Sequence, residues 1–348
     1  MVKSVRRGVR AREGPLYAAV TVGWLVLTLL ACGMAIHGDW EEVQAGFERH
    51  ADHELAVLRE RLRANDGVLD GLAGLLASVD ELHGPPLQSF ANQIVRTHPQ
   101  IHMVEVVERV PAEARRAFET ELARRTGGDG RLARFDYAAG RSWGPVAQKA
   151  EYFPISFIWP DLPQARTVIG LDLDSVPHLR GPLWDSIESG LTEVSPPFEL
   201  VEGPRAYVMI KPARRESGRA SRDEVPTRFA LLVIKLSALR PEVINAGTDQ
   251  AAYFVGRAAH ARTPIYELPA AQQASGLERM LLPERAIEQM DFGSSQPFAL
   301  NMKRQMRAAD VSLDVLAAVV ILAALLLGVL MMFLRRYCSR AAGGRESA

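Results

Sequence analysis

Two long stretches of the chain are almost wholly apolar, whereas the rest alternates between apolar and polar positions. The first stretch runs from Leu16 to Ile36 and the second from Val315 to Leu334. About 20 apolar residues in a helix are enough to cross the hydrocarbon core of a bilayer. The pattern therefore predicts one membrane-spanning helix over residues 16–36 and another over residues 311–334.

The first apolar stretch has two other interpretations. Small residues around Ala35 suit the cleavage site of a secretory signal peptide. The letters "LLAC", which end at Cys32, resemble a lipobox and would make the protein a lipoprotein. The stretch is, however, longer than the usual signal core, and it leads directly into a helical pattern. We therefore predict an uncleaved anchor.

Apolar residues in the next segment recur at alternating intervals of three and four, which is the pattern of a heptad seam. This predicts a stalk helix over residues 37–83. The helix either packs on its own domain or pairs with a second copy. We expect both, with the membrane-near half pairing between subunits and the far half packing inward. Asn65 at a seam position would fix the register of paired helices. The seam is formed by Trp40, Val43, Phe47, Leu55, Leu58, Leu62, Leu69, Leu72, Leu76 and Val79.

From residue 84 onward the pattern is helix, strand, helix, and then a cluster of strands with one further helix. It predicts an α+β fold with antiparallel sheets in two PAS-like subdomains. The membrane-distal one covers residues 84–235, and a weaker membrane-proximal copy covers residues 236–310. Residues 214–228 are predicted to be a solvated loop. The expected helices are 87–99, 111–127, 176–190 and 236–246, and the expected strands are 101–110, 152–160, 167–174, 196–203, 205–214, 228–236, 250–257, 263–269 and 296–305.

The distribution of charge predicts the orientation of the chain in a membrane. Residues 1–15 and 335–348 are short and rich in arginine, so the positive-inside rule places both in the cytoplasm. Residues 37–310 are then outside, and the abundance of Ala, Arg and Leu suggests a bacterial inner membrane with a periplasmic domain. The exterior domain contains no cysteine, so its core alone must stabilise it in an oxidising compartment. The balance of 41 basic and 41 acidic residues gives no sign of a nucleic-acid partner.

Four blocks of sequence resemble a known family. They are "HPQIHMVEVVERVPAEARRAFE", "YFPISFIWP", "GLDLDSVPHLRGPLWDSIESG" and "SPPFELVEG", in this order and between the two apolar stretches. In these blocks the chain resembles the CHASE domain, the extracellular sensory domain found in front of histidine kinases and nucleotide cyclases, including plant cytokinin receptors. The resemblance extends from about Phe47 to Ile210 and more weakly to about Gly256. It implies a long stalk helix, two stacked PAS-like subdomains and a ligand pocket in the membrane-distal one.

The resemblance also implies candidate ligand-binding residues. An aspartate in the family's "LD" motif binds the adenine ring system of cytokinins, and Asp172 is the matching position, with Leu171 beside it. Val194 matches an aliphatic residue that lines the family's pocket, and the strand "YFPISFIWP" supplies wall residues, for which Phe153 and Phe157 are the candidates. The implied ligand is a small organic molecule, adenine-like or otherwise. A carboxylate in an apolar cup accepts two N–H groups from a planar heterocycle through strong charge-assisted hydrogen bonds.

Asp172, Phe153 and Phe157 could also serve the fold rather than bind a ligand. Asp172 could cap the helix that starts near Val176, although Asp174 and Ser175 are the nearer candidates for capping. Phe153 and Phe157 are typical core residues, and their equal strand parity predicts that they share a face.

Three classes of function differ in how well the sequence supports them. The first is a sensor that passes ligand binding through its membrane helices to a partner histidine kinase or cyclase, as a homodimer paired through stalk and spans. The second is a membrane scaffold that has lost its ligand. The third is an enzyme, for which we find no catalytic residues, metal site or cofactor motif: His50 and His53 have no third ligand nearby, and "TGGDG" is a lone turn. Residues 335–348 contain no output domain, so either a partner carries it or the chain is truncated before it.

Overall fold

The computed structural model describes residues 2–79, 84–137, 140–201, 203–214, 225–239, 247–255, 262–291 and 293–343. The chain divides into two compact units. One comprises Met1–His50, Gln273–Arg285 and Arg304–Ala348, and the other comprises Ala51–Gln272 and Ala286–Lys303. Helix α1 and strands β13 and β14 each cross from one unit into the other.

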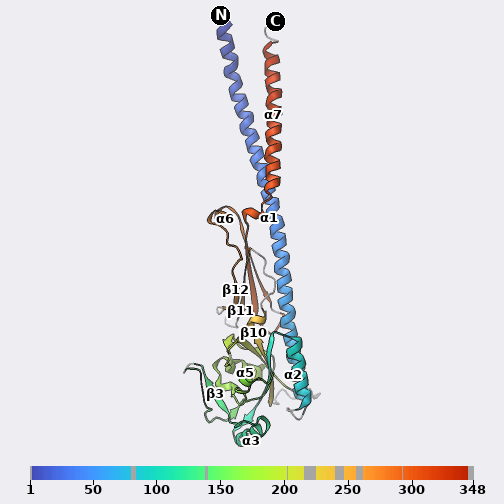
Figure 1. The fold of residues 1–348 in the computed structure, drawn as a ribbon, viewed down its shortest axis with the longest axis vertical. Coiled ribbons are helices and arrows are strands. Elements are labelled where there is room, and N and C mark those ends of the chain that lie inside the picture. Colours follow the sequence, from blue (N-terminus) through green and yellow to red (C-terminus); the bar gives the residue numbers. More distant parts are fainter. Residues whose placement is uncertain are drawn as a thin grey trace. The chain divides into compact units, whose positions relative to one another are not determined.

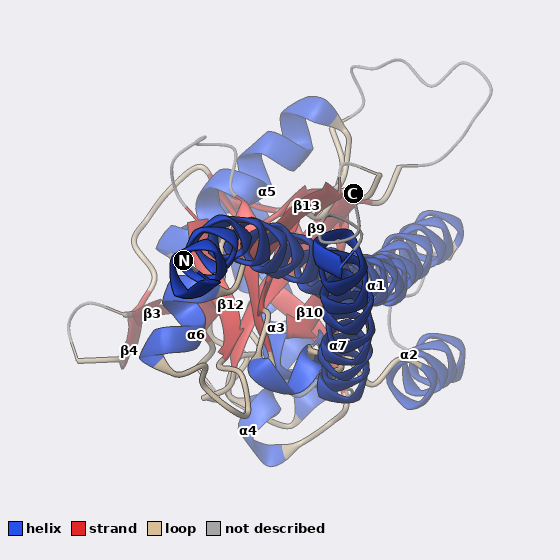
Figure 2. Cartoon of the chain, turned by 90° about the horizontal axis from the view of Figure 1, so that it is seen from above, coloured by secondary structure: helices blue, strands red, loops and turns tan. Residues whose placement is uncertain are grey.

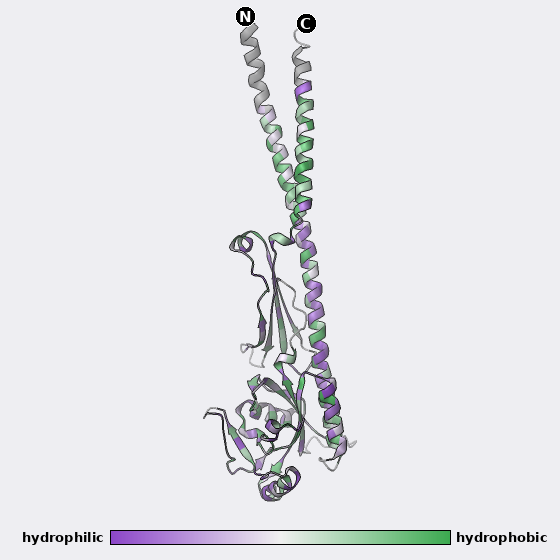
Figure 3. Cartoon of the chain, viewed as in Figure 1, coloured by the Kyte–Doolittle hydropathy of each residue, from purple (hydrophilic) through white to green (hydrophobic). Residues whose placement is uncertain are grey.

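The first unit contains the two apolar helices (Figure 3). Helix α1 extends over Val2–Ser78, and helix α7 extends over Leu313–Gly343. Each is long and apolar enough to cross a membrane. The predicted span 16–36 lies within α1, and α7 contains the predicted span 311–334 except for its first two residues. The two helices pack together, because the indole Nε1 of Trp24 donates a hydrogen bond of 2.9 Å to the carbonyl oxygen of Ala323. Just before α7 begins, the backbone N–H and the hydroxyl of Ser312 both donate hydrogen bonds of 2.9 Å to the Asp39 carboxylate of α1.

The second unit is built on a six-stranded sheet (Figure 1). Its strand order is β6-β1-β10-β9-β7, with β8 also paired to β9. The described pairings in this sheet are all antiparallel. Its strands are β1 (Ile101–Glu108), β6 (Ile155–Trp159), β7 (Glu193–Val194), β8 (Phe198–Glu199), β9 (Arg205–Pro212) and β10 (Arg228–Lys235).

Each face of this sheet carries its own hydrophobic core, because successive side chains of a strand point to opposite faces. Residues 58–76 of α1 and helix α2 (Pro85–Thr97) cover one face, which we call the stalk face. Helix α4 (Pro163–Arg166), helix α5 (Pro177–Ser189) and the segment between them cover the other, which we call the loop face. Figure 2 shows α2 and α5 on opposite sides of the strands.

A second sheet of four strands has the order β12-β11-β14-β13. Two short two-stranded sheets and several helices and helical turns complete the described elements. The remaining bounds are β2 (Val110–Pro111) with β5 (Glu151–Tyr152), β3 (Ala133–Asp136) with β4 (Ser142–Pro145), β11 (Thr248–Val255), β12 (Arg262–Leu268), β13 (Glu284–Asp291), β14 (Phe298–Gln305), α3 (Arg115–Thr126), α6 (Gly276–Leu281), and the 3-10 turns η1 (Ala112–Ala114), η2 (Leu173–Ser175), η3 (Leu236–Leu239) and η4 (Ala308–Asp310).

The α+β class and the two sheets flanked by apolar helices are confirmed, and α2, α3, α5, β1, β9 and β10 lie where their patterns predicted. The prediction of a strand over residues 167–174 is wrong. That segment is a turn, two isolated bridges and η2, because Gly170 at φ 87° turns the chain back. Of the described residues within the strand predicted over 196–203, only Phe198 and Glu199 form a strand, and residues 236–239 form a 3-10 turn. Residues 240–246 and most of the predicted loop 214–228 lie outside the described residues.

The seam of α1 packs inward over its far half, as predicted. The seam side chains from Leu58 to Leu76 lie in the stalk-face core. Asn65 does not face a second copy. Its amide nitrogen donates to the side-chain oxygen of Gln296 at 3.0 Å, and its oxygen accepts from Gln100 at 3.0 Å. Pairing of the membrane-near half of α1 with another chain stays a prediction.

Two glycines after α3 offer a matched test of the local packing. Gly127 (φ 68°) and Gly130 (φ 64°) both have left-handed backbones, which cost a residue with a side chain about 1–2 kcal/mol. A Cβ at Gly127 meets open space, whereas one at Gly130 would overlap the backbone of Glu119 and Ala123. We expect Gly130→Ala to lower the free energy of unfolding by at least about 1 kcal/mol more than Gly127→Ala. Equal losses in denaturant titrations of the two variants would contradict this packing.

Candidate functional site

Asp172 lies on the loop face, in the segment between α4 and η2. Its backbone N–H donates to the carbonyl of Ala133 at 2.9 Å, and the residue forms an isolated bridge with Pro154. The side chain is completely buried. One carboxylate oxygen accepts a hydrogen bond of 2.8 Å from the backbone N–H of Phe153. The carboxylate therefore joins this segment to the chain that enters β6.

The second oxygen of Asp172 is paired with Lys149, a residue that the sequence analysis did not single out. Lys149 Nζ lies 2.6 Å from Asp172 Oδ2 and also 2.6 Å from Asp174 Oδ2. Asp174 in turn accepts a hydrogen bond of 2.7 Å from the indole of Trp184 and lies 3.4 Å from Arg180. We call these five side chains the Asp172 cluster. Within this cluster the carboxylates of Asp172 and Asp174 share one cation, the ammonium group of Lys149.

The two carboxylates have opposite electrostatic environments. Burial raises the pKa of Asp172 above its ordinary value, although the bonds from Lys149 and Phe153 act in the other direction. Burial also acts upward on Asp174, but the hydrogen bonds from Lys149 and Trp184 prevail and lower its pKa. Asp174 is therefore the more easily ionised of the two, and ionising Asp172 costs more free energy.

The predicted capping roles are wrong. Helix α5 has Val176 as its N-cap, and no side chain caps it. Pro177 is the first helical residue and has no N–H, so one of the donors that a cap would satisfy is missing. The Ser175 hydroxyl instead donates to the carbonyl of Asp172 at 2.6 Å, and Asp174 is engaged by Lys149 and Trp184.

The structure brings three of the five predicted site residues together and separates the other two from them. Asp172, Leu171 and Phe153 lie on the loop face. Phe157 and Val194 pack into the stalk-face core, on the other side of the same sheet. One cavity on either face cannot be lined by all five.

A β-bulge explains why the parity argument was wrong for Phe153 and Phe157. Phe157 is opposite Val106, but Ile155 is opposite Val107, so one extra residue is inserted into β6. A bulge inverts the alternation of side chains beyond it. Phe153 also precedes the strand, where its ring packs edge-on at 5.5 Å from Trp184 and 5.9 Å from Phe229. Phe153 is thus a core residue that also carries the backbone donor for Asp172.

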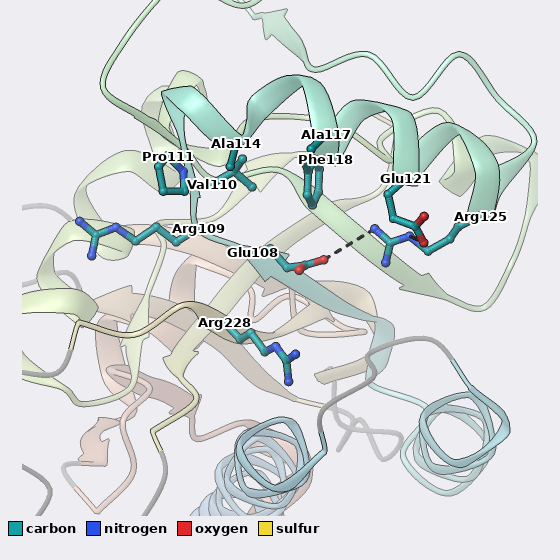
Figure 4. A pocket seen from close by; sticks show the side chains of 10 residues that line it. All are labelled: Glu108, Arg109, Val110, Pro111, Ala114, Ala117, Phe118, Glu121, Arg125 and Arg228. Carbon is teal, nitrogen blue, oxygen red and sulfur yellow. Dashed lines mark ion pairs between the residues drawn. The ribbon is translucent and has the colours of Figure 1, made fainter.

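A separate pocket of about 440 Å³ lies beside α3 (Figure 4). Its wall combines apolar side chains of β2, η1 and α3 with charged side chains from β1, the residue that follows β1, α3 and β10. The lining residues are Glu108, Arg109, Val110, Pro111, Ala114, Ala117, Phe118, Glu121, Arg125 and Arg228. None of them was predicted as a site residue. Nine lie in residues 108–125, and only the fold brings Arg228 beside them.

The cations of this pocket already have partners within the protein. Arg109 pairs with Glu151 at 2.5 Å, and Arg125 lies 3.8 Å from Glu108 and 3.6 Å from Glu121. Arg228 donates bonds of 3.2 and 2.5 Å to the carbonyls of Leu76 and Val79, where α1 ends. The pocket therefore has little uncompensated charge to offer a ligand, and its clearest role is to hold the end of α1.

Comparison with known proteins identifies the family. Residues 86–251 match the CHASE domain, within the range of the resemblance described above. This part of the chain is a CHASE domain. The protein thus carries an extracellular ligand-binding sensor domain, between two helices that are able to span a membrane. No curated protein sequence matches the chain.

Solved structures show only a loose likeness. An extracellular ligand binding receptor from Desulfohalobium retbaense has 12% identity and a TM-score of 0.38, over 79% of this chain and 40% of its own. The ligand-binding domain of the Pseudomonas aeruginosa amino acid chemoreceptor PctC, in complex with GABA, has 12% identity and a TM-score of 0.40, over 75% of this chain and 98% of its own. A methyl-accepting chemotaxis protein X has 11% identity and a TM-score of 0.36, over 79% and 98%. The chain thus spans 40% of the first of these proteins.

Proposed function

We propose that this protein is a two-pass membrane sensor that binds a small organic molecule outside the cytoplasm of a bacterial cell. In this proposal α1 and α7 anchor it in the inner membrane, and both termini are cytoplasmic. The ligand-binding subdomain comprises residues 84–235, and residues 236–310 form a second subdomain nearer the membrane. The stalk over residues 37–83 pairs with that of a second copy. Ligand binding is transmitted through the spans to a partner histidine kinase or cyclase.

The observation that carries this proposal is the Asp172 cluster inside a CHASE domain. Burying a carboxylate costs free energy even when it is paired. A fully buried carboxylate such as Asp172 is therefore a good candidate for a residue with a function. Its counter-ion Lys149 belongs to the irregular segment between β4 and β5 and is about a quarter exposed. A ligand with two N–H donors, such as a planar heterocycle, would replace the ammonium group between Asp172 and Asp174. Trp184, at the solvent side of the cluster, would cover it.

The test is a thermal-shift panel of adenine derivatives and other N–H heterocycles on the full-length protein in detergent. At about 100 times the dissociation constant, a ligand should stabilise the protein by about 2.7 kcal/mol. We expect Asp172→Asn, which keeps the shape of the side chain, to lose the shift. Glu188→Gln removes an exposed charge from α5 and is the matched control, expected to respond like the wild type. If the same ligand stabilises Asp172→Asn and wild type equally, Asp172 is not in the site.

A ligand-free scaffold is the second candidate function. It is favoured by the position of Lys149, whose ammonium group already lies between the two carboxylates. Lys149 already pairs with both carboxylates at 2.6 Å, through a hydrogen bond to Asp174 and a charge contact with Asp172. If this candidate is correct, no compound of the panel shifts the wild type, whereas a kinase or cyclase still co-purifies with the protein. If no kinase or cyclase co-purifies with the protein, transmission to such a partner is excluded.

A further inference from the structure

Helix α6 carries three large apolar side chains that the protein does not cover. Leu277 is 71% exposed, Met280 82% and Leu281 73%. These fractions are as large as those in the first apolar stretch, where Leu29 is 71% and Met34 77% exposed. Apolar side chains this exposed, and next to one another, indicate a surface that meets something other than water.

The three side chains form one face of α6. Their positions i, i+3 and i+4 lie on the same side of a helix. The polar residues Glu278 and Arg279 lie between them in the sequence and point elsewhere around the helix. A capping box holds the first turn, because the Ser275 hydroxyl accepts from the N–H of Glu278 and the Glu278 carboxylate accepts from the N–H of Ser275. The apolar face is therefore presented by an ordered turn.

Hydrogen bonds hold α6 beside the residues that lead into α7. The Glu278 carboxylate accepts a bond of 2.9 Å from the backbone N–H of Ala308, five positions before α7 begins at Leu313. Just beyond α6, the carbonyl of Pro283 accepts from the N–H of Met306 at 3.1 Å, and the carbonyl of Leu282 accepts from the amide of Gln305 at 2.9 Å. The backbone bonds to Glu278 lower its pKa to about 2, so this tie persists at neutral and mildly acidic pH.

We propose that α6 is an interfacial membrane anchor whose Leu277, Met280 and Leu281 side chains enter the outer surface of the bilayer. This rests on the proposed membrane insertion of α1 and α7. A short amphipathic helix lies in the headgroup region with its apolar face toward the acyl chains. Because α6 is bonded to the residues that enter α7, it is held where the second span emerges from the lipid. Exposed Arg279 is placed to reach lipid phosphate groups.

The alternative occupant of this face is a second copy of the chain. Three side chains cover much less than the roughly 800 Å² per partner that a stable protein interface buries. The bilayer needs no such area from α6, because the spans supply the anchoring. The physical consequence of the lipid contact is that α6 fixes the depth at which the chain before α7 meets the membrane surface.

The experiment measures how deep α6 lies. Full-length protein with Cys32→Ser and Cys338→Ser receives one new cysteine, which is labelled with an environment-sensitive fluorophore. The protein is reconstituted into vesicles of phosphatidylcholine and phosphatidylglycerol, with or without a nitroxide on the upper part of the acyl chain. Met280→Cys is the test position. Leu191→Cys is the control for an exposed apolar site remote in sequence from the spans, and Leu322→Cys is the control for a site within α7.

We expect nitroxide lipid to quench the Met280→Cys label at least about twofold more than the Leu191→Cys label. The proposal is overturned if the Leu322→Cys label is quenched and the Met280→Cys label behaves like Leu191→Cys. It is also overturned if the Met280→Cys proteins form disulfide-linked dimers without lipid quenching, because the face then meets a second copy. Absence of quenching at Leu322 would instead refute membrane insertion of α7, and with it both this proposal and the proposed function.

Discussion

Asp172→Ala is expected to lower the free energy of unfolding by about 3–5 kcal/mol, because it removes one partner of a buried ion pair. The change leaves Lys149 beside an apolar cup with only Asp174, and it leaves the N–H of Phe153 without its acceptor. It also removes the side-chain link between the segment before η2 and the chain entering β6, although backbone hydrogen bonds between the two segments remain. Chemical denaturation of the full-length protein in detergent, followed by tryptophan fluorescence, measures the loss.

Two further variants separate this effect from a simple loss of volume. Lys149→Ala should also destabilise strongly, since it leaves the fully buried carboxylate of Asp172 and the partly buried one of Asp174 without their shared cation. The double variant should lose less than the sum of the two single losses, by about 0.5–3 kcal/mol, as expected for groups in contact. Asp161→Ala is the matched control, because Asp161 pairs with Arg166 at 2.5 Å on the exposed surface, where such pairs contribute about 0–1 kcal/mol. A loss at Asp172 no larger than at Asp161 would contradict the buried pairing.

Gln296→Ala should have an effect of similar size on the stalk face. The Gln296 oxygen accepts from the amide of Asn65 at 3.0 Å and from the hydroxyl of Tyr207 at 2.6 Å. Its nitrogen donates to the carbonyl of Leu62 at 2.8 Å. All these side chains are fully buried, and burial also raises the pKa of Tyr207. Truncation leaves the donors of Asn65 and Tyr207 without an acceptor, at about 1–3 kcal/mol each, and adds a cavity. We expect a total loss of about 3–5 kcal/mol.

The matched control for Gln296 is Gln93→Ala on α2. Gln93 bonds to Thr97 on the exposed side of that helix, so its loss should change the unfolding free energy by less than about 0.5 kcal/mol. Gln296→Glu keeps the volume but removes the amide donor to Leu62. If Gln296→Ala and Gln93→Ala unfold at the same denaturant concentration, the network does not hold α1 to the sheet. Gln296→Ala also tests whether the stalk helix stays ordered without the hydrogen bonds of Gln296.

The elements predicted from sequence are those that a local pattern specifies. The two apolar stretches, the inward seam of α1 and the β-branched strand at Ile101–Glu108 all follow from the spacing of side chains along one segment. The order of the four blocks was sufficient to predict the CHASE domain, because that resemblance also depends on sequence alone. The errors lie in segments without a clear period. Residues 167–174 contain alternating apolar residues, but Gly170 and bonds to Ala133 and Phe153 make them a turn with bridges.

The sequence by itself determined which segments are apolar enough to enter a membrane, which family the exterior domain resembles, and that Asp172 is a carboxylate in an apolar context. Only the tertiary structure decided what surrounds Asp172. Lys149 is remote from it in the sequence, so no periodicity predicts their pairing at 2.6 Å. A single bulge in β6 decided that Phe157 and Val194 lie on the opposite face from Asp172, since one inserted residue inverts the side-chain alternation. The partner of Asn65 was likewise decided by the fold, because a buried amide bonds to whichever polar group packing brings to it. Here that group is Gln296, which lies 231 positions later in the chain.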